Sequence, residues 1–230
     1  MAVSYMNFDF GYMIEIIPEL LKYVPVTLYI SIVSMLFAII IGIFLSLILV
    51  NRIPILQQLS KVYISFFRGT PPLVQLLMIY FGLPQLVPAL NSISATTAAI
   101  IAFSLNVSAY LAEIFRAGLE SVDKGQAEAA LTVGMTYPQA LRGIILPQAA
   151  RNAIPATGNT FLGLLKNSSL AFTIGVTELL AQGKLLATAT LNFFEAYMAV
   201  ALIYWGLTVV YSGLQSWYEN RISKPYVRET

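Results

Sequence analysis

Residues 123–147 read DKGQAEAALTVGMTYPQALRGIILP, a polar stretch that is interrupted by glycine and proline and flanked on both sides by long hydrophobic runs. The hydrocarbon core of a bilayer offers no hydrogen-bond partners to polar groups. Such a stretch cannot face lipid tails, so we expect it to lie in water or against another protein. The hydrophobic runs around it indicate what kind of chain carries it.

The chain is strongly apolar. Of its 230 residues 58% are hydrophobic and 10% are charged, whereas soluble domains carry about 25% charged residues. A helix needs ~20 apolar residues to cross the hydrocarbon core. The runs that reach this length are Val24–Val50, Leu59–Leu83, Ser94–Leu119, Ile154–Ile174 and Phe193–Trp217. We therefore predict an all-α membrane protein with about five transmembrane helices, organised as one domain over residues 1–230.

The composition excludes several kinds of chemistry. The chain has no cysteine and no histidine, which removes disulfides, thiol chemistry and the commonest metal ligand. We predict neither a metal site nor a catalytic residue. A phosphate-binding loop is also absent, because glutamate and leucine occupy the first glycine and the Ser/Thr positions around Gly183-Lys184. ATP hydrolysis would need a separate chain. We expect no nucleic-acid partner, although the net charge of +2 says little on this point in a chain this apolar.

Basic residues concentrate in alternate loops, and the loop Pro84–Ile93 has no charge. The basic residues of these loops are Arg52, Lys61, Lys124, Arg142, Arg151, Arg221, Lys224 and Arg228. By the positive-inside rule these loops are cytoplasmic. The N-terminus is then outside, the C-terminus is inside, and residues 123–147 face the cytoplasm. Met1–Glu19 carries acidic residues and no basic one, so we do not interpret it as a signal peptide.

Capping residues divide residues 123–147 into short helices. Asp123 with Gln126, and Thr136 with Gln139, have the form of helix N-caps with capping-box partners. Gly134 lies where a left-handed residue would end the first helix. We expect the second helix to run toward Ile145, where Pro147 bends or stops it. From these residues alone, an amphipathic hairpin on the membrane surface and a docking element are equally good interpretations.

The spacing of particular residues resembles the EAA signature of ABC-importer permeases. Its fixed positions are Glu128, Ala129, Ala130, Gly134, Ile144, Leu146 and Pro147. Other segments are similar to the polar-amino-acid branch of these permeases: Phe67–Pro71, Ser108–Glu113, Asp123–Gln126 and Leu146–Ala150. A third group looks like permeases of L-cystine uptake systems: Tyr80–Pro84, Leu202–Trp205 and Glu219-Asn220.

This resemblance implies a type I ABC-importer permease fold in a multi-pass protein of the prokaryotic plasma membrane. It implies a second permease subunit, two cytosolic ATPases that bind ATP and Mg, and an extracytoplasmic amino-acid-binding protein. The residues expected to couple to the ATPase are Gly125, Glu128, Ala129, Ala130, Gly134, Ile144 and Pro147. Glu128 is expected to pair with a basic group of the ATPase. Charge complementarity of this kind sets the register of an interface.

Polar residues inside the predicted spans are candidates for the solute pathway, because ionisable groups at membrane depth are costly. The candidates are Asn106, Ser108, Glu113, Lys166, Asn167 and Ser168. Glu113 and Glu120 lie at helical spacing from Arg116, so a structural ion-pair ladder is the alternative for that helix. Lys166 has no local partner in the sequence and suits a carboxylate.

Asn167 occupies a position at which related permeases often have Asp or Glu. The amide disfavours a cationic solute such as arginine and favours a neutral or dicarboxylate amino acid such as L-cystine. Glutamine, glutamate, histidine and arginine are the alternative solutes. A purely structural hydrogen bond from Asn167 is an equally good interpretation.

A break is predicted in the second hydrophobic run. Pro71 and Pro72 remove two amide donors after Arg68 and disfavour helix at Thr70. This is either a structural bend or a broken helix at the pathway, a device that recurs in transporters. A secondary transporter driven by an ion gradient is the more distant alternative function. It is disfavoured because no pair of broken helices in corresponding repeats is visible.

Overall fold

The computed structural model describes residues 8–223, and every regular element in that range is a helix. In chain order these are α1 (Phe10–Glu15), α2 (Ile17–Leu21), α3 (Val24–Val50), α4 (Pro54–Gly69), α5 (Pro72–Leu77), the π-helix η1 (Met78–Gly82), α6 (Leu83–Leu86), the 3-10 helix η2 (Pro88–Leu90), α7 (Ala95–Glu120), α8 (Lys124–Thr132), α9 (Tyr137–Ala140), the π-helix η3 (Leu141–Ile145), α10 (Leu146–Asn167), the 3-10 helix η4 (Ser168–Ile174), α11 (Leu179–Thr190) and α12 (Phe193–Ser223). Lys224 and Arg228, which contribute to the predicted orientation, lie outside the described residues.

By length and composition, α3, α7 and α12 can each cross a membrane. Two bent pairs bring the number to five if each is one span: Pro54–Gly69 with Pro72–Leu86, bent by 109°, and Tyr137–Ile174 with Leu179–Thr190, bent by 54°. The predicted first, third and fifth spans coincide with single helices. The second, Leu59–Leu83, is not one continuous helix, because α4 ends at Gly69 and α5 begins at Pro72.

Helix α7 is the centre of the fold and contacts α3, α4, α5 and α10. Small side chains make the close approach possible: Ala98, Ala99, Ala102 and Ala112 of α7 are buried. Gly42 of α3 lies so close to α7 that a Cβ there would be 2.8 Å from the Cβ of Leu111. Packing of small residues brings helices together where lipid supplies no hydrophobic driving force.

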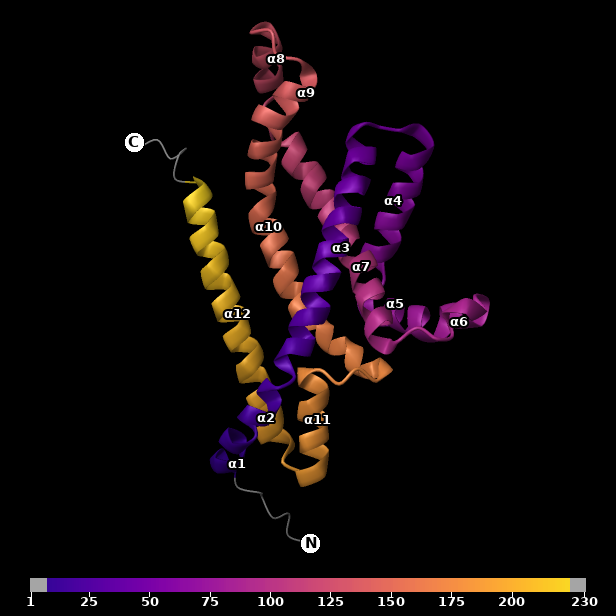
Figure 1. Cartoon of the computed structure of the whole chain (residues 1–230), viewed down its shortest axis with the longest axis vertical. Coiled ribbons are helices and arrows are strands. Elements are labelled where there is room, and N and C mark those ends of the chain that lie inside the picture. Colours follow the sequence, from indigo (N-terminus) through magenta and orange to yellow (C-terminus); the bar gives the residue numbers. More distant parts are fainter. Residues whose placement is uncertain (1–7, 224–230) are drawn as a thin grey trace.

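A second core joins α1 and α2 to α11 and α12. Met13, Ile16 and Leu20 of the short N-terminal helices pack against Leu179 and Val200. Figure 1 shows α1, α2 and α11 at one end of the molecule and α8 and α9 at the other. Helix α12 runs from the first end toward the second. This arrangement is compatible with the predicted orientation, which stays a prediction.

Candidate functional site

Helix α8 of the coupling segment, residues 123–147, has a defined cap at each end. At its start the Asp123 side chain accepts a hydrogen bond of 2.6 Å from the Gly125 amide. At its end the Met135 amide donates to Ala130 O and the Gly134 amide donates to Leu131 O. This pair of bonds is the Schellman motif, and Gly134 takes the left-handed conformation with φ +85° that the motif requires. The turn predicted at Gly134 is therefore present.

A capping box begins α9: the Thr136 amide donates 2.8 Å to the Gln139 side chain. The chain then passes through the π-helix η3 and continues as α10 to Asn167. The predicted stop near Pro147 is wrong, because η3 runs directly into α10 and Pro147 lies in the first turn of α10. The wider π turn before it accommodates the proline and keeps the helix continuous.

The coupling segment exposes one charged and several apolar side chains. Glu128 is exposed and makes no ion pair with any residue between 8 and 223. Val133 is 78% and Tyr137 58% exposed, whereas Ala130 and Ala140 pack inside the hairpin. Tyrosine is among the residues enriched at protein interfaces, so the exposed Tyr137 is compatible with a docking surface.

Two side-chain hydrogen bonds connect the coupling segment and the end of α7 to α10. Gln148 Nε2 donates 3.3 Å to Gln126 Oε1, and Asn152 Nδ2 donates 2.7 Å to Ser121 Oγ. The first of these bonds joins α8 directly to α10, and the second joins the end of α7 to the same helix. Ile144 is half-buried and Pro147 exposed within this segment.

The charged residues of α7 form a ladder. Arg116 donates 2.6 Å to Glu113 and 2.6 Å to Glu120, and a further bond of 3.0 Å joins its Nε to Glu113. Glu113 is therefore neutralised on its own helix. This geometry fits the structural alternative for the α7 stripe, and contact of Glu113 with a solute stays a prediction.

Asn106 and Ser108 are buried between α4 and α7. Asn106 Nδ2 donates 3.0 Å to Phe67 O and 3.0 Å to Gln75 Oε1. Ser108 Oγ lies 2.8 Å from the hydroxyl of Tyr63. In this conformation both side chains join helices. Their role as pathway residues stays a prediction.

Helix α10 presents a polar face to the outside of the chain. Asn159, Lys166 and Asn167 are exposed, and a Cβ placed on Gly163 would meet no atom within 4 Å. Lys166 lines a hollow of about 290 Å³ together with Tyr197 and Tyr204 of α12. Among residues 8–223 no ion pair neutralises Lys166. Ser168, by contrast, is buried and donates 2.7 Å to Leu165 O.

The sequence analysis missed two buried acids, Glu178 and Glu195, of which Glu178 is the more deeply buried. Glu178 is fully buried and accepts hydrogen bonds from the amides of Leu180 and Ala181, at 3.0 and 2.8 Å. The hydroxyl of Tyr204 on α12 donates 2.9 Å to it, and that of Thr27 on α3 lies 3.4 Å away. An acid directly before the apolar start of α11 is an N-cap signal that could have found Glu178.

Residues 35–224 match the protein family described as binding-protein-dependent transport system inner membrane component. The chain belongs to this family. It is therefore a membrane-embedded transport component rather than an enzyme. The helical organisation described above is that of this family, so the predicted ABC-importer permease fold is confirmed.

Two curated relatives of this transport family are similar over almost their whole length. The probable amino-acid permease protein YxeN of Bacillus subtilis is 61% identical over 218 residues, which cover 95% of this chain and 97% of YxeN. The L-cystine transport system permease protein TcyL of the same organism is 42% identical over 225 residues, covering 96% and 94% of the two chains.

One solved structure, described as the crystal structure of an amino acid ABC transporter with histidines, superposes with a TM-score of 0.85 at 39% identity. The superposition covers 94% of this chain and 100% of that one.

Proposed function

We propose that this chain is the membrane permease of an ATP-driven, binding-protein-dependent importer of a polar amino acid, with L-cystine as the solute. The observation that carries the proposal is the coupling segment, whose rigid turns connect an exposed Glu128 on α8 to α10. Relatives described as amino-acid permeases support the class of solute.

Two permease subunits, identical or closely related, would complete the path. The polar face of α10 is exposed in the single chain, and polar residues at membrane depth need water or protein against them. Two cytosolic ATPases would hold ATP and Mg and dock on the coupling segments. An extracytoplasmic binding protein would deliver the solute.

L-cystine is supported by the resemblance to TcyL and by the charge of α10. Lys166 lacks an ion-pair partner among the described residues and is chemically suited to a carboxylate. Asn167 beside it adds a neutral amide in place of an acid. Another polar amino acid, such as glutamine, glutamate, histidine or arginine, is the second candidate. For histidine, the solved amino acid transporter with histidines gives support.

The test is uptake by the purified permease in proteoliposomes, with and without its ATPase and binding protein. We expect ATP-dependent uptake of labelled L-cystine that needs both partners, and weaker uptake of the other amino acids. If the transporter takes up one of these amino acids more strongly, that amino acid replaces L-cystine as the proposed solute. Uptake driven by a sodium or proton gradient alone would contradict the importer itself.

A further inference from the structure

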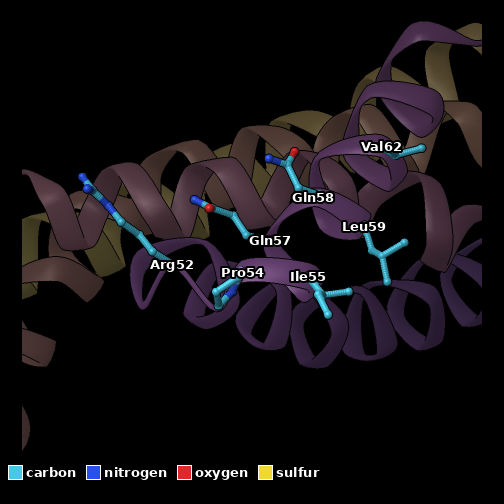
Figure 2. A pocket seen from close by; sticks show the side chains of 7 residues that line it. All are labelled: Arg52, Pro54, Ile55, Gln57, Gln58, Leu59 and Val62. Atoms are coloured by element: carbon cyan, nitrogen blue, oxygen red, sulfur yellow. The ribbon is translucent and has the colours of Figure 1, made fainter.

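Helix α4 has two exposed faces of opposite character. Its apolar residues Ile55, Leu59, Val62 and Phe66 follow one helical stripe, and its polar residues Gln58, Lys61, Ser65 and Arg68 follow another. Figure 2 shows Gln57 and Gln58 extending to one side of the helix and Ile55 and Leu59 to the other, around a shallow hollow of about 700 Å³ at the α3–α4 turn. An apolar face suits lipid or a second subunit, but the polar stripe requires an aqueous or ionic partner.

The polar stripe ends at Arg68, in the last turn of α4. The guanidinium carbon of Arg68 lies 5.5 Å from the centre of the Tyr110 ring on α7. Stacking on an aromatic ring holds a guanidinium in place and leaves its N–H edge free for a planar anion. Tyr110 is itself 39% exposed, so the pair is open to the surroundings.

Hydrogen bonds from buried side chains hold the break between α4 and α5, directly after Arg68. Gln75 Nε2 donates 3.0 Å to Phe67 O and 2.7 Å to Thr70 Oγ1, across the break between α4 and α5. Asn106 donates to the same Phe67 carbonyl and to Gln75 Oε1. These buried amides satisfy the end of α4 and fix the backbone that carries Arg68.

The charge of Arg68 is not neutralised within residues 8–223. The next acid along α7, Glu113, is one turn beyond Tyr110 and is already bound to Arg116. An uncompensated guanidinium in a broken membrane segment is costly unless water or an anion meets it. The free, preoriented N–H groups of Arg68 match the two oxygens of a carboxylate.

We propose that Arg68, held over Tyr110, binds the carboxylate of the transported amino acid at the α4–α7 corner. The inference rests on the proposed function, because it assigns a contact for that solute. It gives Arg68 a role in binding, beyond its position before the helix break. An acidic residue of a second permease copy is the competing partner.

The test uses the complete transporter in proteoliposomes, with labelled L-cystine and labelled L-glutamine as probes. Uptake and binding-protein-stimulated ATP hydrolysis are measured for Arg68→Gln, Arg68→Lys, Tyr110→Phe and Tyr110→Leu. The matched control is Lys184→Gln, which removes a second cation stacked on an aromatic ring, 5.0 Å from Phe172. All variants are first compared for thermal stability and for the size of the assembled complex.

We expect Arg68→Gln to lower uptake at least tenfold while stimulated ATP hydrolysis continues, and Arg68→Lys to retain part of the uptake. Tyr110→Leu should lower uptake more than Tyr110→Phe, and Lys184→Gln should stay within twofold of the wild type. If Arg68→Gln takes up the amino acid as fast as the wild type, this inference is overturned and the proposed function is unaffected. A smaller or less stable complex overturns this inference as well, because it would assign Arg68 to subunit contact or to folding. Absence of amino-acid uptake by the wild type overturns the proposed function, and this inference with it.

Discussion

At the scale of single residues, Gly134 is required for its backbone and not for its size. Its φ is +85°, and a Cβ there would meet no atom within 4 Å. Gly134→Ala should therefore cost about 1–2 kcal/mol of local turn stability, because L-residues disfavour the left-handed region. We expect normal membrane insertion with reduced ATP-driven uptake, measured in membrane fractions and vesicles.

Gly143→Ala is the matched control, since its Cβ would reach only Met135 Cε, at 3.9 Å, in a helical backbone. Equal uptake by Gly134→Ala and Gly143→Ala would show that the turn does not contribute to coupling.

The carboxylate of Glu178 contributes to stability by accepting four hydrogen bonds, of which the one from Thr27 is the longest, at 3.4 Å. Removing its carboxylate in Glu178→Ala leaves the Leu180 and Ala181 amides and the Tyr204 hydroxyl without their acceptor. Buried donors without partners cost about 1–3 kcal/mol each, so we expect a loss of about 3 kcal/mol in total after partial rearrangement. Thermal unfolding in detergent measures the effect. Glu178→Gln retains an acceptor and should lose less; equal loss by both variants would contradict this account.

Residue-scale prediction succeeded where the determining partner is close in sequence. The turn at Gly134 and the capping box of Thr136 with Gln139 depend on neighbours within five residues. The surroundings of Asn106 and Glu178 depend on residues 31 and 151 positions away, Gln75 and Thr27. Sequence spacing cannot show which distant helix supplies such a partner, so the contacts with Gln75 and Thr27 could not be predicted, although the local N-cap of Glu178 could.

At the scale of helices, α3 and α7 are held together by close backbone approach at Gly42. A Cβ there would lie 2.8 Å from Leu111 Cβ and 3.3 Å from both Ala112 N and Ser108 O. Backbone atoms cannot move aside as a side-chain end can, so Gly42→Ala should destabilise the protein by about 1–3 kcal/mol. Thermal unfolding of the purified permease measures the loss.

Gly213→Ala on α12 serves as the comparison, because its Cβ would meet nothing within 4 Å. Alanine is the better helix former, so this variant should be unchanged or slightly more stable. If Gly42→Ala unfolds at the same temperature as Gly213→Ala, the contact between α3 and α7 is looser than it appears in the structure.

Prolines show how far element boundaries can be predicted. Pro71 and Pro72 predict a helix break, and the chain turns by 109° there. Pro147 predicts a bend or a helix end, and the helix does not end there, because the π-helix η3 runs directly into α10. The π-helix η1 precedes Leu83-Pro84 in the same way. Pro72 stands at the start of α5, where its missing N–H leaves no helix hydrogen bond unmade, whereas Pro84 and Pro147 follow π turns inside continuous helical segments.

At the scale of the whole molecule, hydropathy and the EAA signature predict the fold. The single chain, however, leaves surfaces that its own helices do not cover. Helix α12 exposes large apolar side chains around most of its circumference, among them Trp205, Val209 and Leu214. Helix α10 exposes a polar face that includes Asn159 and Lys166. Lipid can cover the first and cannot cover the second. Which subunit meets the polar face depends on another chain, so the sequence of this one does not specify it.

The absence of native cysteine makes the polar face of α10 directly testable. Gly163→Cys adds a side chain whose Cβ would meet no atom within 4 Å, so the variant should fold normally. If this face lines an aqueous path, a charged, water-soluble maleimide should label Cys at position 163, because the reagent reacts with the thiolate, which forms in water. Val209 on α12 is 52% exposed in the single chain and is expected to face lipid. Val209→Cys should therefore stay unlabelled, because no thiolate forms in lipid. Labelling is measured in sealed vesicles with the complete transporter, with and without ATP. Equal protection of both thiols in every state would place α10 against lipid or a dry interface and would contradict a path along it.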